Sequence, residues 1–229
     1  MAKNKGKKII LFLMEGVSDC TSLEFIDKLN KNEMLKFYPT RGDITTKNGI
    51  NSQNCIKEVN EHLKMFLATN KFCKSDVIKI IHVLDTDGAY IPNEKIFEDE
   101  NAVRFIYTTT GIIAPSKQAV TQRNENKKEV LEKLLSTPKI NSIPYELYYM
   151  SCNLEHVLHN KLELLSDEEK KELANLFADS FYEREEEFLE FINSKSFKVE
   201  GNYKETWHFI KQELNSVNRY SNLWLVFNN

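Results

Sequence analysis

The sequence predicts an α/β protein built on a mostly parallel β-sheet flanked by helices, with a helical extension at its C-terminal end. Two observations carry this prediction. Residues 7–14 and 77–84 are short apolar runs that each stop at acidic residues and a glycine, as buried parallel strands do where they open into loops. Between and after these runs, apolar residues recur at helical spacing, so that strands and helices alternate along the chain.

Length and composition are those of an ordinary soluble globular protein: of 229 residues, 41% are hydrophobic and 28% are charged. We expect an α/β domain over residues 1–160 and a helical extension over residues 161–229, packed on that domain or appended to it. The net charge of −3 lacks the basic surplus of strong nucleic-acid-binding proteins. A local basic face is still compatible with this balance, because an acidic cluster contributes several of the negative charges.

Cysteine usage and hydropathy predict a cytoplasmic protein without a membrane partner. The four cysteines are scattered, with no CxxC pair, as expected of reduced thiols. An apolar run follows the lysines at 3, 5, 7 and 8, but it is too short for a signal peptide and lacks a cleavage pattern. No apolar stretch approaches the length of a membrane span. The cysteines are Cys20, Cys55, Cys73 and Cys152.

The first predicted strand, residues 7–14, runs directly into Glu15 and Gly16. Ser18 is a suitable N-cap for a helix over residues 19–30, which places Asp19 in the first helical turn. The helix dipole favours a carboxylate there whatever its function. Asp19 is therefore either a capping charge or a member of an acidic site next to Glu15.

The next elements continue the alternation of strands and helices. A weaker strand at 35–38 leads to Arg41-Gly42-Asp43, which we interpret as a turn. Residues 51–70 carry apolar side chains at helical spacing and are predicted to form a crossover helix on the sheet. The strongest strand, 77–84, then ends at Asp85-Thr86-Asp87-Gly88.

The second half begins with a predicted fourth strand over 103–107. A polar stretch, 122–128, leads into a short helix ending near Leu135, and a fifth strand is expected over 145–150. The helix that follows this strand carries Glu155, His156 and His159.

The C-terminal extension is predicted to be helical. A long helix over 167–192 with Ser166 as its N-cap precedes another over 204–214. The chain closes with an apolar, aromatic segment over 220–227, for which docking on the core is favoured over an oligomer contact.

Several common sites are excluded. A calcium helix–loop–helix starting at Asp85 needs an acidic fifth residue and a glutamate at the twelfth, but Ala89 and Ile96 stand there. The phosphate-binding GxxxxGK[ST] pattern, the dinucleotide-binding GxGxxG pattern and serine-nucleophile motifs are all absent. What remains is a set of acids at strand ends, which would repel one another without a cation and so favour a hard-metal site.

The two acidic motifs resemble those of the TOPRIM domain, which topoisomerases, bacterial primases and the overcoming-lysogenization-defect (OLD) nucleases share. Glu15-Gly16 matches the glutamate-glycine after that family's first strand, and Asp85-Thr86-Asp87 matches its DxD, about seventy residues later. The resemblance covers roughly residues 7 to 110 and implies a TOPRIM-like Rossmannoid fold. Residues 151–159 are similar to the asparagine-to-glutamate helix start of RloB-like and abortive-infection TOPRIM proteins of phage defence, but lack its proline and phenylalanine.

The resemblance implies a nuclease that hydrolyses phosphodiester bonds of DNA or RNA with one or two Mg²⁺ or Mn²⁺ ions. Glu15, Asp85 and Asp87 would hold the metal, and Asp19, with Glu155, would hold a second ion. Lys117, Lys127 or Lys128 could neutralise the developing phosphate charge, and the sequence does not choose among them. The implied partners are nucleic acid, tRNA among them, and a separately encoded ABC-type ATPase. A homo-oligomer through the helical tail is a further expectation.

Three alternatives stay open. The chain could be a non-catalytic TOPRIM-like module that binds nucleic acid or a partner ATPase. It could also be a regulatory or phosphotransfer α/β protein with a magnesium pocket, although receiver domains fit the glutamate-first order poorly. Finally, Glu155 and His159 share a helix face, as zinc ligands do, but no third ligand is evident. Glu155 could equally serve to cap its helix.

Overall fold

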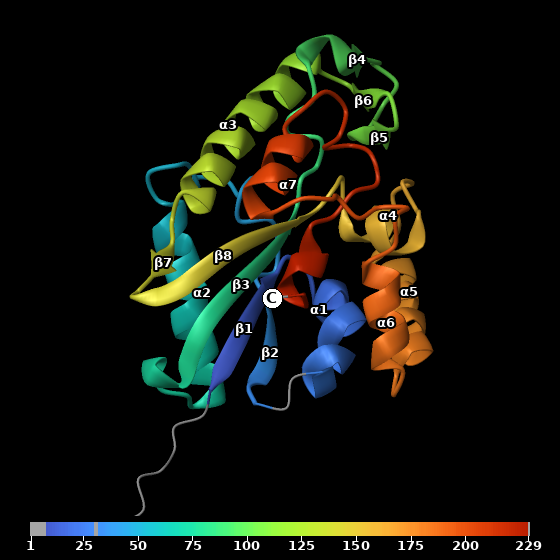
Figure 1. Ribbon diagram of the computed structural model, residues 1–229. Helices are drawn as coiled ribbons and strands as arrows, with labels where there is room; N and C mark the ends of the chain where they lie inside the picture. The colour runs from blue at the N-terminus through green and yellow to red at the C-terminus, as the bar shows by residue number, and fades with distance from the viewer. Residues whose placement is uncertain (1–7, 30–31, 229) are drawn as a thin grey trace, which may run out of the picture.

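The computed structural model describes residues 8–29 and 32–228 and has an α/β architecture around a mostly parallel sheet, as predicted (Figure 1). The sheet has the order β2-β1-β3-β8-β7, in which the first four strands are parallel and β7 pairs antiparallel with β8. The predicted ends at Lys7 and Asn30, and the lysines at 3 and 5, lie outside the described residues. The strands are β1 (Ile9–Met14), β2 (Met34–Pro39), β3 (Val77–Asp85), β7 (Lys139–Ile140) and β8 (Ile143–Met150).

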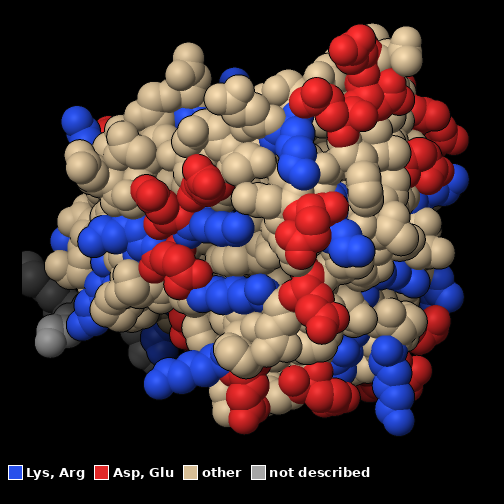
Figure 2. All heavy atoms as spheres, turned by 90° about the horizontal axis from the view of Figure 1, so that it is seen from above, with Lys and Arg blue, Asp and Glu red and all other residues tan. Residues whose placement is uncertain are grey.

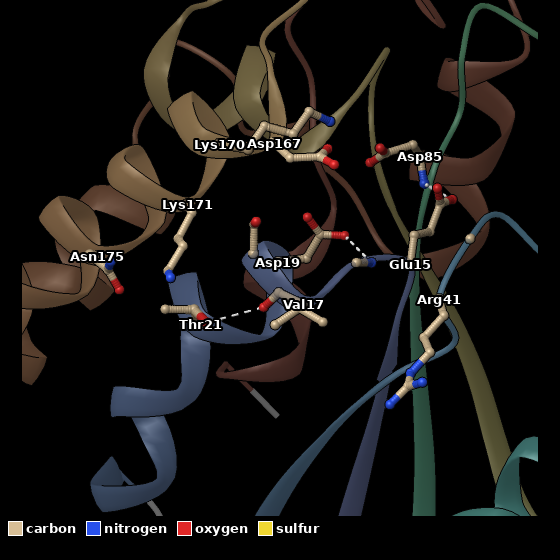
Figure 3. Close-up of a pocket in the computed structure, with 13 residues that line it drawn as sticks. Glu15, Val17, Asp19, Thr21, Arg41, Asp85, Asp167, Lys170, Lys171 and Asn175 are labelled. Carbon is tan, nitrogen blue, oxygen red and sulfur yellow. Dashed lines mark hydrogen bonds between the residues drawn. The ribbon is translucent and has the colours of Figure 1, made fainter.

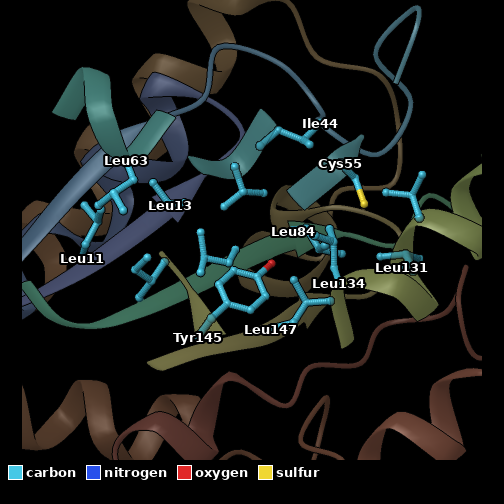
Figure 4. Packing of buried hydrophobic residues seen from close by; sticks show 14 of the residues in the cluster. Leu11, Leu13, Ile44, Cys55, Leu63, Leu84, Leu131, Leu134, Tyr145 and Leu147 are labelled. Carbon is cyan, nitrogen blue, oxygen red and sulfur yellow. The ribbon is translucent and has the colours of Figure 1, made fainter. Parts of the chain in front are cut away.

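Helices cover both faces of this sheet, and alternate strand residues face opposite layers. On β1, Leu11 and Leu13 join the core under α2 (Cys55–Asn70), α3 (Lys117–Leu135) and α7 (Tyr203–Ile210), part of which is drawn in Figure 4. Phe12 and Met14 face the second core, under the remaining helices. Those are α1 (Val17–Leu23), η1 (Glu24–Leu29), α4 (Leu154–His159), α5 (Asp167–Phe181), α6 (Glu185–Ile192) and η4 (Leu223–Val226).

A small second sheet is inserted between β3 and α3. It has the order β4-β6-β5, with β4 (Ile96–Glu98), β5 (Ile106–Thr108) and β6 (Gly111–Ala114). The strand predicted at 103–107 is therefore wrong in place and partner, because β5 pairs antiparallel with β6 and not with the central sheet. Gly111 follows the turn between β5 and β6 at φ 151°, and it passes so close to the chain before β4 that a Cβ there would lie 2.0 Å from the carbonyl oxygen of Lys95. Short 3₁₀ turns, η2 (Lys74–Asp76) and η3 (Asn93–Lys95), precede β3 and β4.

Two helix predictions need correction. The helix expected to end near Leu135 begins much earlier, at Lys117, where the Ser116 hydroxyl accepts a hydrogen bond from the Ala119 amide at 3.2 Å. The polar stretch forms part of this helix because one of its faces, with Asn124 and Lys127, is buried while the opposite face is in contact with solvent. The helix predicted over 167–192 is broken at Glu183, which has a left-handed φ of 58°. The break lets Phe181 of α5 pack against Phe188 and Phe191 of α6, and the aromatic contacts close the bend.

Two further helices differ in length or type from their predictions, and the C-terminal segment does not. The helix predicted over 19–30 is α-helical only to Leu23 and continues as a 3₁₀ helix. The helix predicted over 204–214 ends at Ile210. The C-terminal segment docks on the core as predicted: Leu223 is fully buried, and the Tyr149 amide donates to Asn222 Oδ1 at 2.9 Å. No helix of the described chain is long and apolar enough to cross a membrane.

Candidate functional site

The parallel strands deliver acidic residues to one edge of the sheet. Glu15 follows β1, Asp85 ends β3 with Asp87 two residues later, and Asp43 follows β2. Glu155 comes after β8, in the first turn of α4. Because the carboxyl ends of parallel strands lie together, all five side chains belong to one region of the surface. On the face above these strand ends, basic and acidic side chains lie next to one another (Figure 2).

Hydrogen bonds of Thr86 anchor the turn that carries Asp85 and Asp87 to distant parts of the fold. The Thr86 hydroxyl donates to the Ser216 carbonyl at 2.7 Å and accepts from the Cys152 amide at 3.0 Å. The amide of Asp87 donates to the Cys152 carbonyl at 2.9 Å. The two carboxylates are therefore presented by a rigid turn, fixed by buried backbone contacts far apart in the sequence.

Glu15 and Asp85 form the centre of the acidic edge. The Asp85 amide donates a hydrogen bond to Glu15 Oε1 at 2.9 Å, which ties the ends of β1 and β3 together. Burial, followed by repulsion from neighbouring carboxylates, raises the pKa of both side chains well above the usual range. No Lys, Arg or His side chain of the described residues forms an ion pair with either of them.

Asp19 lies next to this pair and has a local structural role. Its Oδ2 accepts a hydrogen bond from the Gly16 amide at 2.8 Å, so it caps the start of α1. Burial raises its pKa, with Glu155 adding to the effect. The same carboxylate also faces the cavity between Glu15 and α5 (Figure 3). Capping and participation in an acidic site are thus compatible in this geometry. We refer to Glu15, Asp19 and Asp85 as the open half of the site.

Asp43, Asp87 and Lys127 form a second cluster, which we call the closed half. The Lys127 side chain is completely buried, and its Nζ lies 2.8 Å from Asp43 Oδ2 and 2.6 Å from Asp87 Oδ2. Asp43 also accepts hydrogen bonds from the Thr45 amide and the Thr46 hydroxyl, both at 2.7 Å.

Electrostatics in the closed half oppose those in the open half. Burial by itself raises the pKa of Asp43, but the charge of Lys127 and the hydrogen bonds outweigh it and lower the pKa to about 2. Burial lowers the pKa of Lys127, and the charges of Asp43 and Asp87 more than reverse this, so the ammonium stays protonated. Arg123 adds a second cation, with its Nη1 4.0 Å from Asp87 Oδ2.

Glu155 is buried and already paired. Its Oε1 lies 3.1 Å from Lys170 Nζ of α5, and its exposed fraction is 5%. The α4 helix is capped by Asn153, whose Oδ1 accepts from the His156 amide at 2.8 Å, so Glu155 is not the cap. The Lys170 pair brings α5, from the C-terminal extension, against the acidic edge.

A cavity of about 650 Å³ opens between the strand ends and α5 (Figure 3). Glu15 and Asp85 lie together at one end of it, and Lys171 and Asn175 of α5 lie at the other. Arg41 contributes a further cation from the loop after β2, and both Arg41 and Lys171 are exposed. The lining residues are Glu15, Gly16, Val17, Ser18, Asp19, Thr21, Arg41, Gly42, Asp85, Asp167, Lys170, Lys171 and Asn175.

The structure separates the three candidate lysines. Lys127 lies among the carboxylates. Lys128, one residue later on α3, lines a shallow surface pocket with Ser52 and Glu132 and contacts none of the acidic site residues. Lys117 is exposed at the first residue of α3. Of the three, only Lys127 is brought to the acidic edge.

The residues considered as a zinc site do not converge. His159 packs edge-on against the Phe177 ring, with 5.4 Å between centroids, and Glu155 is engaged by Lys170. In the described part of the chain, no group of three or more His, Cys, Asp or Glu side chains is arranged to hold a metal ion as it stands.

The open half suits Mg²⁺ or Mn²⁺ in the kind of donor it offers. Its carboxylate oxygens are hard ligands, and Mg²⁺ is usually held by only one or two carboxylates together with waters and substrate oxygens. Glu15 and Asp85 are joined by a hydrogen bond at adjacent strand ends and have raised pKa values, as expected of carboxylates that a cation would relieve. A preformed cage of three ligands is not required for such binding.

Sequence reasoning missed Asp43, Arg123 and Lys170. Asp43 had been interpreted as part of a turn, yet it follows a strand just as Glu15 does, so the rule that identified Glu15 could have identified it. Lys170 and Arg123 carried no usable signal, because a single basic residue on a charged helix is most often a solvated one.

Fold and site together define an α/β protein whose parallel sheet carries a carboxylate-lined cavity at the carboxyl ends of its strands. Comparisons with protein-family models, with curated proteins and with solved structures find no match to this chain.

Proposed function

We propose that this chain is a metal-dependent TOPRIM-like nuclease that hydrolyses phosphodiester bonds of DNA or RNA and acts in bacterial defence against phage. The single observation that carries the proposal is the Glu15–Asp85 pair. Glu15 and Asp85 follow adjacent parallel strands and lie at one end of a cavity, where the Asp85 amide donates to the Glu15 carboxylate. Both carboxylates have raised pKa values and no cation paired to either among the described residues. The TOPRIM assignment rests on the order of the Glu15-Gly16 and Asp85-Thr86-Asp87 motifs.

In this proposal Glu15 and Asp85 hold the divalent ion, with Asp19 beside them. A bound Mg²⁺ or Mn²⁺ supplies Lewis-acid polarisation of a phosphoryl oxygen and a lower pKa for a bound water. The protein would position the metal ligands. The Asp85 amide holds the Glu15 carboxylate by a hydrogen bond, and the hydrogen bond from the Thr86 hydroxyl to Ser216 holds the turn that carries Asp85. Lys127 keeps Asp87 in place at 2.6 Å.

The walls of the cavity offer cations to a polyanionic substrate. Arg41 and Lys171 are exposed, line the same cavity and form no ion pair with another described residue. Phosphate groups flanking the scissile bond would meet these side chains, which neutralise backbone charge without reading sequence. A substrate that enters the cavity would therefore meet basic side chains next to the acidic edge, even though the whole chain has a net charge of −3.

Partners and cellular role follow from the resemblance. Nucleic acid, including tRNA, is the proposed substrate, and a separately encoded ABC-type ATPase is a proposed partner. Residues 161–229 are the proposed surface for that partner or for a second copy of the chain.

A second candidate is a non-catalytic module that binds nucleic acid or a partner. One observation favours it: the carboxylates of the described residues do not converge as a metal cage, and Lys127 already occupies Asp87. In that case the acidic edge would contribute structure, and the cations of the cavity would contribute binding.

The test is cleavage of plasmid DNA, single-stranded DNA and total tRNA with Mg²⁺ or Mn²⁺, comparing the native chain with Glu15→Gln and Asp85→Asn. We expect at least one substrate to be cut by the native chain and each variant to lose about 10²-fold or more in rate. Lys128→Gln, on the same helix as Lys127, is the matched control and should cut normally. Undiminished cleavage by both variants would refute the site, and no cleavage by any form would favour the binding module.

A further inference from the structure

Among the described residues, Lys127 is the one fully buried cation of the acidic edge, and it joins two strand ends. It comes from α3 and has no exposed surface, and its Nζ bridges Asp43 after β2 and Asp87 after β3 at 2.8 and 2.6 Å. Burying an ammonium group is costly unless carboxylates and hydrogen bonds compensate it. Here two carboxylates do so, and the Thr45 amide and Thr46 hydroxyl hold one of them in place.

The ion pair engages one oxygen of Asp87, so a metal ion would have to compete with Lys127 for this carboxylate. Its Oδ2 is occupied by the ammonium group at 2.6 Å, and Arg123 approaches the same oxygen at 4.0 Å. Glu155, which the resemblance assigns to a second ion together with Asp19, is likewise paired with Lys170, at 3.1 Å. Asp87, expected beside Glu15 and Asp85, and Glu155, expected beside Asp19, are therefore each paired with a cation of the protein itself.

The open half differs in this respect. Among the described residues, no cationic side chain pairs with Glu15, Asp19 or Asp85, although the three lie close enough to influence one another's ionisation. Only this part of the acidic edge combines cavity access with uncompensated carboxylates.

We propose that the site takes one divalent cation, on Glu15 and Asp85, and that Lys127 stands in for a second ion between Asp43 and Asp87. Lys127 is then a positioning residue, because it holds Asp87 and the end of β2 in place and does not reach the cavity. The inference rests on the proposed function for the presence of the first ion. It adds the number of ions and the reason for that number.

The experiment measures the number of Mn²⁺ ions bound per full-length chain by titration calorimetry and electron paramagnetic resonance. We expect one ion for the native chain and none for Asp85→Asn. For Lys127→Met we expect two, because its loss leaves Asp43 and Asp87 without the ammonium group that joins them, and Arg123 lies 4.0 Å from Asp87 alone. Lys128→Met is the matched control and should keep one ion.

Thermal unfolding supplies an independent readout. In EDTA, Lys127→Met should unfold roughly 10 °C below the native chain, because two buried carboxylates lose their partner. Saturating Mn²⁺ should restore most of this loss. A double variant, Lys127→Met with Asp43→Asn, removes one charge of each sign. Its unfolding temperature in EDTA should therefore fall less, Mn²⁺ should raise it less, and it should bind one ion.

The outcomes separate this inference from the proposed function. Two ions on the native chain would overturn the inference and leave the nuclease proposal intact. No ion on the native chain would overturn both. If Lys127→Met does not fold, the native count and the double variant still decide: two ions on the double variant would overturn the inference, and one would support it.

Discussion

The open and closed halves of the acidic edge are both built on carboxylates from strand ends, but only the closed half contains a cation that balances their charge. In the closed half, Lys127 compensates Asp43 and Asp87, and the pKa of Asp43 falls to about 2. In the open half, Glu15 and Asp85 lie at neighbouring strand ends without an ion-paired cation among the described residues, and burial and repulsion raise both pKa values. The closed half therefore stabilises the fold, whereas the open half costs stability that a bound cation would return.

The largest expected effect contrasts one neutralised carboxylate from each half. Asp43→Asn should lower the free energy of unfolding by about 3 kcal/mol, because it leaves the buried charge of Lys127 with one partner. Glu15→Gln should raise it by roughly 1 kcal/mol in EDTA, because the amide oxygen can still accept from the Asp85 amide while the repulsion disappears. Urea unfolding at pH 7.5 measures both.

Glu129→Gln is the control for this contrast, because Glu129 is an exposed carboxylate on α3, away from both halves. Its stability should change by less than about 0.5 kcal/mol. If Asp43→Asn and Glu15→Gln changed stability in the same direction, the distinction between the two halves would fail.

A smaller effect is expected from pH. Because the folded-state pKa values of Glu15 and Asp85 are raised, the native chain holds more protons than the unfolded chain. Their contribution is full below the ordinary carboxyl pKa and is lost as pH rises through the raised values. Without divalent ions, stability should decline from about pH 5 upward, and the decline should flatten in Glu15→Gln/Asp85→Asn.

The contribution of the closed half to stability should instead depend on pH in the acid range. Since the pKa of Asp43 is lowered to about 2, its contribution is present above its unfolded value and is lost as pH falls toward 2. Saturating Mg²⁺ should remove the decline in stability above pH 5 that the open half causes, because a ligand that binds only the folded chain stabilises it. It should leave the loss of stability at acid pH unchanged. A native chain whose stability rose steadily from pH 5 to 8 in EDTA would contradict the raised pKa values.

The parts of the fold that were predictable are those with strong local patterns. The apolar runs of β1 and β3 end at acids, and the open half could be identified from them because parallel strands align their carboxyl ends. The inserted sheet was not predictable, because its strands have three or four residues and its turn depends on Gly111 passing close to Lys95. The break at Glu183 was hidden by continuous helical periodicity.

The choice of Lys127 over Lys128 shows where sequence reasoning about the site stopped. One residue is about 100° around a helix, so the phase of α3 decides which lysine is buried. That phase was in the sequence: the buried residues are Val120, Asn124, Lys127, Val130, Leu131 and Leu134, which recur at helical spacing. The polar character of residues 122–128 obscured it, because a buried lysine is rare unless it is paired. Its partner Asp43, assigned to a turn, was the missing observation.

The smallest expected effect concerns the cations that line the cavity, Lys171 at its α5 end, opposite Glu15 and Asp85, and Arg41 on the loop before Asp43. In a Glu15→Gln background, which the proposed nuclease activity should not survive, Lys171→Gln and Arg41→Gln should each weaken binding of a single-stranded oligonucleotide by about 3- to 10-fold. Each should also reduce the slope of log affinity against log salt by about 1, because each removes one phosphate contact. Lys64→Gln, an exposed lysine paired with Glu61 on α2, should change neither. If substrate phosphates reach only the α5 end of the cavity, Lys171→Gln alone will alter the salt slope; if neither variant does, nucleic acid does not enter this cavity.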